Sequence, residues 1–305
     1  MKRLEKKLKS TLYNGLALAR WGTLYPTAVR PHRSVSPITF NPRDPRARKK
    51  LIHDTVRRNI PRNRAFWNRA IAQLQPQTAL DVGVNYGECL FTAKYPDASK
   101  AFGFEANPSL KTYLDQTHAA HPDADRIALR FGLAGSAHGG HAEFHVDTQW
   151  SGSSSAVQYI DDPSRYQTIQ APLISIDGSL ADAEHHTDTL VFKIDVEGYE
   201  SFVLDGMTDT LSKARWVVGL IEINEVSAKA AGIELAEYFD RLQQRFGVWA
   251  FNRQAKLTDL RGQGLDALTA ACQKPGRPAK KIGTDLVLTA GEHTPEIDHF
   301  IGSWS

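Results

Sequence analysis

Cysteine and long apolar runs are both scarce in this sequence. The 305 residues include two cysteines, Cys89 and Cys272, which have neither the spacing of metal ligands nor the density of a secreted disulfide scaffold. This indicates a reducing compartment, and we expect a cytoplasmic location. No segment approaches the roughly 18 consecutive apolar residues that a membrane-spanning helix needs. With 41% hydrophobic and 23% charged residues, the composition is typical of a water-soluble globular protein.

The sequence also lacks the G-x-G-x-x-G fingerprint, in which glycines bring a helix N-terminus onto a dinucleotide pyrophosphate. The nearest segment, Gly83-Val84-Asn85-Tyr86-Gly87, has two glycines at a different spacing. A dinucleotide-dependent enzyme is therefore disfavoured. No internal repeat is visible either.

Charge is distributed unevenly along the chain. Residues 1–64 carry 17 bases and 3 acids, a net charge of +14, whereas the other 241 residues carry 20 bases and 31 acids, a net charge of −11. We therefore expect a basic N-terminal extension over residues 1–64 and a separate acidic catalytic domain over residues 65–305.

The start of the extension has helical periodicity. Its leucines fall on one side of a helix and its bases on the other, which predicts an amphipathic basic helix from Leu4 to Arg20. Tyr13 and Asn14 interrupt the apolar stretch that a secretory signal would need, so we do not expect this segment to be a signal peptide. The prolines between Pro26 and Pro61 disfavour long helices there.

After residue 63, short apolar runs alternate with helical patterns. The first helix has Phe66, Trp67, Ile71 and Leu74 spaced for one buried face. The alternation predicts an α/β fold, a Rossmann-like, mainly parallel seven-stranded sheet with helices on both faces. The last strand is the candidate for an antiparallel one. The expected strands are 78–82, 101–104, 127–129, 190–194, 216–221, 248–251 and 285–289.

The most informative segment runs from Ala79 through Asp81 to Glu88, a buried strand followed by a glycine-bearing turn. Such a turn lets a ligand approach the backbone closely. Glu105 follows at the end of the next apolar run, at a spacing that fits a carboxylate bound to a ribose. Either feature alone also fits an ordinary strand-to-helix connection.

A second acidic group follows later strands. Asp195 and Glu197 come after the apolar run 190–194, and Glu222 ends the run 217–221. Ligands of open α/β sheets bind outside the carboxyl ends of the strands, so these acids should face the same crevice as Asp81 and Glu105.

These blocks resemble those of the FkbM-type methyltransferases, enzymes that use S-adenosylmethionine and mostly O-methylate sugars and related hydroxylated natural products. The resemblance covers about residues 78 to 251, and residues 1–64 lie outside it. Asn85 stands where the family commonly has glycine. The matching blocks are Asp81 to Gly87, Phe104-Glu105-Ala106-Asn107-Pro108, Ser175-Ile176-Asp177 and Lys193 to Glu200.

The resemblance implies S-adenosylmethionine as the cofactor, on a class I methyltransferase fold. It places Gly83, Asn85 and Gly87 around the methionine part, Glu105 at the ribose and Asp195 near the sulfonium. Adenine contacts are expected after the third strand, where small residues also fit a plain turn. The full set of expected cofactor-binding residues is Asp81, Gly83, Asn85, Gly87, Glu105, Ala106, Leu133, Ala134 and Asp195.

A hydroxyl acceptor would profit from a general base, and Asp195, Glu197 and Glu222 are the catalytic candidates in that order. Glu197 could instead be a helix N-terminal carboxylate, and Glu222 could form an ion pair. Clustered carboxylates could also hold Mg²⁺. The glycines among His138, His141 and His145 favour a turn and hairpin over a zinc site, and we assign no metal-binding residues.

The acceptor class expected from the resemblance is a hydroxyl of a sugar, glycan or glycosylated natural product. The alternative is an RNA methyltransferase, or another nucleic-acid-binding protein, that uses residues 1–64 as a basic arm. The acidic domain opposes a nucleic acid partner near the crevice. The partner we expect for residues 1–64 is an anionic membrane surface or a polyanionic glycan. The membrane would place the enzyme at its inner face.

Overall fold

The computed structural model describes residues 2–181, 188–252, 254–272, 281–291 and 295–304, with side chains from residue 11 onward except that of residue 13. A central sheet of eight strands has the order β12-β11-β13-β10-β9-β3-β4-β5. Its strands are β3 (Thr78–Val82), β4 (Lys100–Glu105), β5 (Ile127–Phe131), β9 (Thr189–Ile194), β10 (Trp216–Asn224), β11 (Gly247–Phe251), β12 (Leu257–Asp259) and β13 (Gly283–Gly291).

The sheet is mainly parallel. Strands β5, β4, β3, β9 and β10 pair in parallel, and β13 lies antiparallel between β10 and β11. All seven expected strands are present, including the antiparallel last one, and the predicted fold class is confirmed. The short β12 adds an eighth strand, antiparallel to β11 at the edge.

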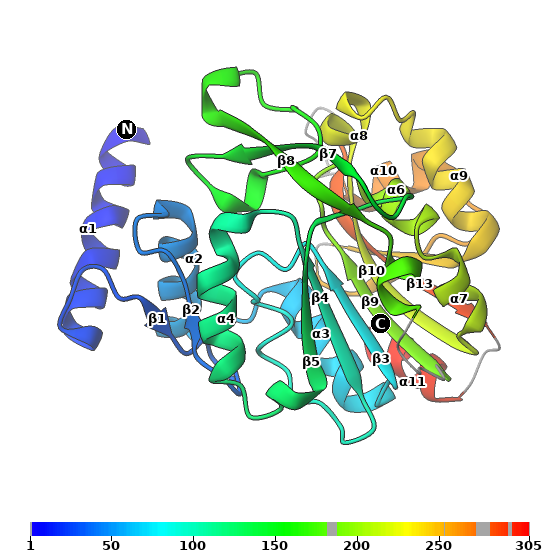
Figure 1. The fold of residues 1–305 in the computed structure, drawn as a ribbon, viewed down its shortest axis with the longest axis horizontal. Helices are drawn as coiled ribbons and strands as arrows, with labels where there is room; N and C mark the ends of the chain where they lie inside the picture. Colours follow the sequence, from blue (N-terminus) through cyan, green and yellow to red (C-terminus); the bar gives the residue numbers. More distant parts are fainter. Residues whose placement is uncertain (1, 182–187, 253, 273–280, 292–294, 305) are drawn as a thin grey trace.

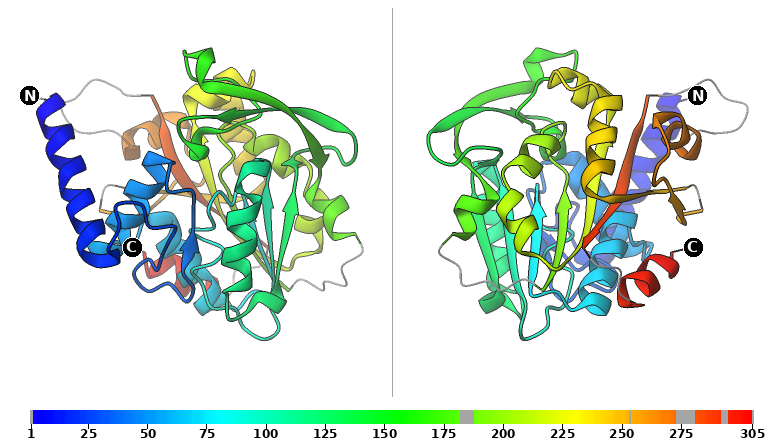
Figure 2. Two further views of the ribbon diagram at one scale, coloured as in Figure 1. Left: turned by 60° about the vertical axis from the view of Figure 1, so that its left-hand side comes forward. Right: turned by 90° about the vertical axis from the view of Figure 1, so that its right-hand side faces the viewer.

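Helices cover both faces of the sheet (Figures 1 and 2). One face packs against α2, α3, α4 and α11, and the other against α5, α6, α8, α9 and α10. The helices are α1 (Lys2–Trp21), α2 (Pro45–Val56), α3 (Arg62–Leu74), α4 (Lys111–Ala119), α5 (Ile176–Leu180), α6 (Glu200–Asp205), α7 (Thr208–Lys213), α8 (Glu225–Ala230), α9 (Leu235–Arg245), α10 (Leu265–Cys272) and α11 (Pro295–Gly302).

Both core layers follow from the two-residue alternation along each strand. In β3, Ala79 belongs to the core under α3, and the next residue, Leu80, to the core on the opposite face. On α3, the predicted apolar face is confirmed, because Phe66, Trp67 and Ile71 are fully buried. Because helices cover both faces of the sheet, both sides of each strand are buried, and the strands are continuous apolar runs in the sequence.

A smaller sheet stands above one end of the central sheet, in the connection between β5 and β9 (Figure 1). It contains β6 (Leu133–Ala134), β7 (His141–Asp147) and β8 (Tyr166–Ile174) in the order β6-β8-β7. Gly139 and Gly140 have positive φ angles and form the expected turn before β7, which pairs antiparallel with β8.

The N-terminal region divides into two parts. The amphipathic helix predicted from Leu4 to Arg20 is present as α1. From residue 28 onward, β1 (Ala28–Val29), β2 (Ile38–Thr39) and α2 contribute to the core under the central sheet. The structure therefore has no packing boundary at residue 64, where the change in charge suggested one.

The expectation that prolines disfavour a long helix between Pro26 and Pro61 is wrong for α2, which has 12 residues. Proline is compatible with the first turn of a helix, where its missing N–H has no intrahelical partner. Pro45 occupies that turn, and the Asp44 carboxylate accepts hydrogen bonds from the N–H groups of Arg46 and Ala47. The Asp-Pro pair is thus a start signal for α2.

Candidate active site

The carboxyl ends of β3, β4, β5 and β9 meet at a pocket beneath the smaller sheet. Seven of the nine expected cofactor-binding residues line it, the exceptions being Asp81 and Gly87. The structure thus brings together Gly83, Asn85, Glu105, Ala106, Leu133, Ala134 and Asp195.

The turn after β3 requires unusual backbone angles. Gly83, Asn85 and Gly87 have φ angles of 80°, 52° and 84°, in the left-handed region that favours glycine and tolerates asparagine. A Cβ atom on Gly83 would lie 2.0 Å from the carbonyl oxygen of Asp195. Any side chain at position 83 would therefore separate the ends of β3 and β9. Gly87 lies away from the pocket, facing the ring of Phe91.

Glu105 is held in place by backbone donors. Its carboxylate accepts hydrogen bonds from the N–H of Asn85 at 2.7 Å and from the N–H of Asn107 at 2.8 Å. Burial raises the pKa of Glu105, and these two hydrogen bonds oppose that effect. Each carboxylate oxygen retains further acceptor capacity. The pocket-facing carboxylate can therefore accept hydrogen bonds from vicinal hydroxyl groups such as those of a ribose.

Asp81 lies beneath the pocket rather than in its wall. Its side chain is 1% exposed and accepts hydrogen bonds from Lys193 Nζ at 3.1 Å and from the N–H of Leu90. The side chain that was expected to contact the cofactor is therefore not part of the pocket wall. Asp81 instead joins β3 to β9 through a buried ion pair.

Lys193 lies at the centre of a buried network that was not expected from the sequence. Its Nζ bonds to Asp81 and to the carbonyl oxygen of Gly83, and it lies 3.5 Å from Asp195 Oδ2. Burial would lower the pKa of Lys193, but the charges of Asp81 and Asp195 more than offset this, so its pKa lies well above the usual range. A lysine within an otherwise apolar strand is a signal, because lysine is almost never buried unpaired.

The turn after β9 is also constrained. Glu197 and Gly198 have φ angles of 58° and 104°, and a Cβ on Gly198 would approach the backbone of Ser227 to 2.7 Å. The buried carboxylate of Glu200 accepts from the N–H groups of Val196 and Gly198. Glu200 thus begins α6 and closes the turn. Because Glu197 precedes that helix, the alternative of a helix N-terminal carboxylate fits Glu200 better.

Three carboxylates converge beside the pocket. One oxygen each of Asp195, Glu197 and Glu222 lies within 4.8 Å of the others. Burial, reinforced by the charge of Asp195, raises the pKa of Glu197 to about 8. Burial and the charges of Asp195 and Glu197 raise the pKa of Glu222 well above its usual value. Within the described part of the chain, Oε2 of Glu222 is buried without a hydrogen-bond partner.

Carboxylates this close cannot all ionise easily, because like charges in a shared site raise one another's pKa. One proton on Glu197 or Glu222 relieves the repulsion. A group whose pKa lies near neutral pH can also exchange a proton with a bound hydroxyl. The cluster therefore combines an acidic, hydrogen-bond-accepting surface with a proton-transfer group.

Two further contacts were not foreseen from the sequence, because they come from the long connection between β7 and β8. The hydroxyl of Tyr159 donates to Oε2 of Glu197 at 2.8 Å. Ser151 lies within 2.9 Å of both Asn85 Oδ1 and Asp44 Oδ2, so the N-terminal region reaches the pocket wall. Neither segment has a periodic pattern that would reveal these contacts.

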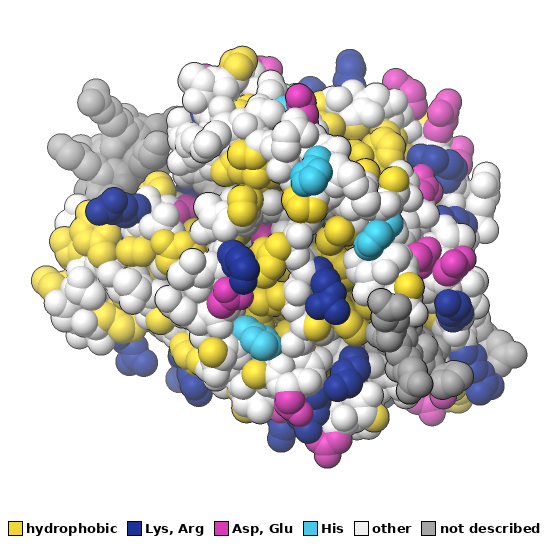
Figure 3. Space-filling model, in the orientation of Figure 1, with side chains coloured by type: hydrophobic (Ala, Val, Ile, Leu, Met, Phe, Trp, Pro, Cys, Tyr) yellow, Lys and Arg dark blue, Asp and Glu magenta, His cyan; other side chains and the backbone are white. Residues whose placement is uncertain are grey.

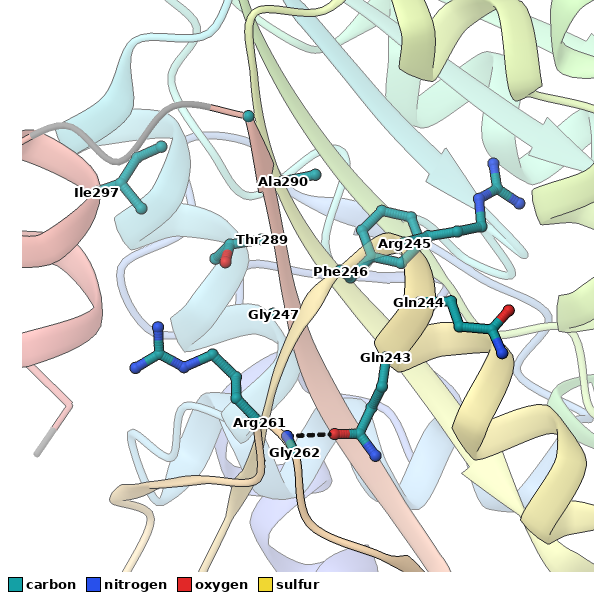
Figure 4. Close-up of a pocket in the computed structure, with 11 residues that line it drawn as sticks. Gln243, Gln244, Arg245, Phe246, Gly247, Arg261, Gly262, Thr289, Ala290 and Ile297 are labelled. Carbon is teal, nitrogen blue, oxygen red and sulfur yellow. Dashed lines mark hydrogen bonds between the residues drawn. The ribbon is translucent and has the colours of Figure 1, made fainter.

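A second hollow lies at the opposite edge of the central sheet (Figure 4). It has a volume of about 410 Å³ and is formed by the start of β11 and the end of β13, with Gln243 and Arg261 at its sides. Arg261 already donates hydrogen bonds to both carboxylate oxygens of Asp259. None of the expected site residues lies there.

The strand order and the glycine-bearing turn are those of the Rossmann-like fold of class I methyltransferases. The family profile described as "Methyltransferase FkbM domain" matches residues 81–248, more than half of the chain. The chain belongs to the FkbM methyltransferase family.

Solved structures were also compared. The O-methyltransferase TomG from Streptomyces achromogenes, in complex with SAM, has 12% identity and a TM-score of 0.39, over 76% of this chain and 81% of its own. Cofactor-bound Rv0187 from MTB has 12% identity and a TM-score of 0.37, over 75% and 81%. The Bacillus cereus O-methyltransferase in complex with SAH has 10% identity and a TM-score of 0.37, over 76% and 83%. No curated protein matches the sequence.

Proposed function

We propose that this methyltransferase transfers the methyl group of S-adenosylmethionine to a hydroxyl oxygen of a sugar, glycan or glycosylated natural product. The observation that carries the proposal is the convergence of Asp195, Glu197 and Glu222 beside the pocket. A polyhydroxylated neutral acceptor suits such a surface, because each hydroxyl can donate a hydrogen bond to a carboxylate.

The pocket residues suit the cofactor. Glu105 can accept from ribose hydroxyls, and Gly83 and Asn85 line the pocket beside it. Leu133 and Ala134 provide a small apolar wall at the end of β5, suited to a purine ring. Bound there, S-adenosylmethionine supplies an electrophilic methyl group. The protein's contribution is to position the acceptor and to accept its proton.

We assign the proton-accepting role to Glu197, although the sequence placed Asp195 first. Asp195 already lies 3.5 Å from the ammonium group of Lys193, which suits an orienting role next to the cofactor. A general base works best when its pKa lies near the working pH, and the pKa of Glu197 is about 8. Glu222 lies next to it, and burial with the charges of Asp195 and Glu197 raises the pKa of Glu222 well above its usual value.

The same charges argue against RNA as the acceptor. Phosphates approaching three converging carboxylates would be repelled at short range, where screening by salt is least effective. Mg²⁺ is not part of the proposal. An acidic cluster is not in itself a metal site, and a shared proton already relieves the repulsion among these carboxylates.

The test is transfer of a labelled methyl group from S-adenosylmethionine to a panel of neutral glycans, glycolipids, phenols and RNA. We expect label on a sugar oxygen, with activity lost in Glu197→Gln. Glu143→Gln, which alters an exposed carboxylate on β7, is the matched control and should be fully active. Label on RNA, or on nitrogen rather than oxygen, would overturn the proposal.

A further inference from the structure

The exposed hydrophobic side chains of this protein are concentrated in one short segment. Among the described residues, the large hydrophobic side chains that are more than one third exposed are Leu12, Leu18, Leu24 and Tyr25, with exposed fractions of 48%, 54%, 37% and 56%. All four lie at the C-terminal half of α1 or directly after it. Figure 3 shows hydrophobic side chains gathered at the left edge of the molecule, where α1 lies.

This segment packs against the folded core. Ala17 is fully buried, and Trp21 packs against the core cluster that includes α2 and α3. Leu12 projects from the other side of α1, because five residues of helix turn by about 140° relative to Ala17. The helix is therefore held by one face while leucines remain exposed.

The exposed charges of residues 11–60 are all positive. Between residues 11 and 60 the acids are Asp44 and Asp54, and both are buried. The exposed bases in the same range are Arg20, Arg30, Arg33, Arg43, Arg46, Lys49, Lys50, Arg57 and Arg58, of which Lys50 pairs with Glu88 at 3.2 Å. Arg48 extends this surface to Tyr25, since its guanidinium lies 4.5 Å from the ring centroid.

We propose that the segment from Leu12 to Tyr25, with the basic surface of residues 20–58, binds the surface of an anionic lipid bilayer. Exposed leucines and a tyrosine gain by entering the boundary between headgroups and acyl chains, and the arginines and lysines gain from anionic headgroups. The mode is peripheral, because among the described residues no helix is long and apolar enough to cross a membrane.

RNA would bind only to the arginine and lysine side chains of this surface. It would gain nothing from Leu12 and Leu18, since aliphatic side chains on a helix neither stack on bases nor contact phosphates. The coincidence of exposed leucines with the exposed bases of residues 20–58 therefore favours lipid. The inference does not depend on the methylated acceptor, because it concerns a surface on α1 rather than the pocket.

The experiment is co-sedimentation of the full chain with vesicles of phosphatidylcholine, alone or mixed with phosphatidylglycerol, at low and high salt. We expect binding to the anionic vesicles that weakens as salt rises, because headgroup attraction is screened. Leu12→Ser combined with Leu18→Ser should weaken binding about tenfold or more. Arg20→Gln combined with Arg43→Gln should also weaken it about tenfold or more.

The matched control for charge is Arg241→Gln combined with Arg245→Gln, on the exposed side of α9. It should bind vesicles as the unaltered protein does. Thermal unfolding of every variant confirms that the fold is intact. The proposal is overturned if the unaltered protein ignores anionic vesicles, if both α1-region variants still bind equally well, or if only RNA is bound.

Discussion

The phenolic hydroxyl of Tyr159 donates a 2.8 Å hydrogen bond to Oε2 of Glu197, linking the connection after β7 to the turn after β9. This contact favours the ionised form of Glu197, whereas burial and Asp195 favour the protonated form. The outcome is a pKa of about 8, which is near the working range of a general base. Tyr159 is therefore a positioning residue for the proposed proton acceptor.

The rate of methyl transfer should rise with pH through about 8, because Glu197 can accept a proton only when it is ionised. In Glu197→Gln the rise should disappear, and kcat/KM should fall about 10²–10⁴-fold. Steady-state rates between about pH 6 and 9.5, on either side of that pKa, measure this. If Glu197→Gln kept the pH profile of the unaltered protein, Glu197 would lose the proton-transfer role.

Tyr159→Phe should shift the same profile to higher pH, because the lost hydrogen bond no longer favours the carboxylate. A hydrogen bond of about 1 kcal/mol corresponds to about 0.7 pH units. The inflection point of kcat/KM is the readout, and a merely structural role for Tyr159 would leave it in place. A shift to lower pH would contradict the assignment.

Stability should fall as the pH rises. The folded-state pKa of Glu197 lies above its usual value of 4.5, so the folded protein binds this proton more tightly than the unfolded chain does. The resulting stabilisation is complete below pH 4.5 and is lost as the pH rises through about 8. Glu197→Gln should lose less stability over this range. At about pH 9 it should be more stable than the unaltered protein, by up to about 1.4 kcal/mol for each unit by which the pKa of Glu197 is raised.

Chemical denaturation at about pH 5, 7 and 9 measures this difference, with Glu143→Gln as the exposed control. The control should follow the unaltered protein at every pH. If Glu197→Gln has the same pH dependence as the control, the carboxylates do not repel one another in the folded state.

Replacing Lys193 with methionine should destabilise the fold by about 3–5 kcal/mol, because Asp81 would remain buried without a counter-charge. The second substitution Asp81→Asn should recover part of this loss. A double-mutant cycle, measured by chemical denaturation, separates the interaction energy between the two residues from the effect of each single substitution. Additive losses in the cycle would show that Lys193 and Asp81 are not coupled.

Activity should survive EDTA, because a shared proton rather than Mg²⁺ offsets the charge of Asp195, Glu197 and Glu222 in our proposal. The measurement is methyl transfer before and after chelation and dialysis. Loss of activity that Mg²⁺ restores would instead make the cluster a metal site, as the sequence had left open.

The parallel sheet was predictable because strands buried on both faces are continuous apolar runs, and each was followed by a helical pattern. The pocket followed from the same reasoning, since Glu105 and Asp195 end parallel strands and must meet at one edge. The side chain of Asp81 was expected in the pocket but lies beneath it. The motif from Asp81 to Gly87 gave the position of this residue at the end of a strand but not the direction of its side chain.

Contacts between distant loops could not be predicted from the sequence. Tyr159 and Ser151 lie in a connection without periodicity, and their partners are 38 and 66 residues away. The packing of residues 28–64 was hidden by their charge, although Asp44 followed by proline was a readable helix start. Net charge described the surface of this region and not its core.

Calorimetric titration with S-adenosylhomocysteine tests the central claim most directly, namely that the pocket at Gly83, Glu105 and Asp195 holds the cofactor. The unaltered protein and Glu143→Gln should bind it alike. Glu105→Ala should bind it about 10- to 100-fold more weakly, as expected for the loss of hydrogen bonds to a charged group worth about 1.5–3 kcal/mol. Equal affinity in a folded Glu105→Ala variant, or no binding by the unaltered protein, would contradict it.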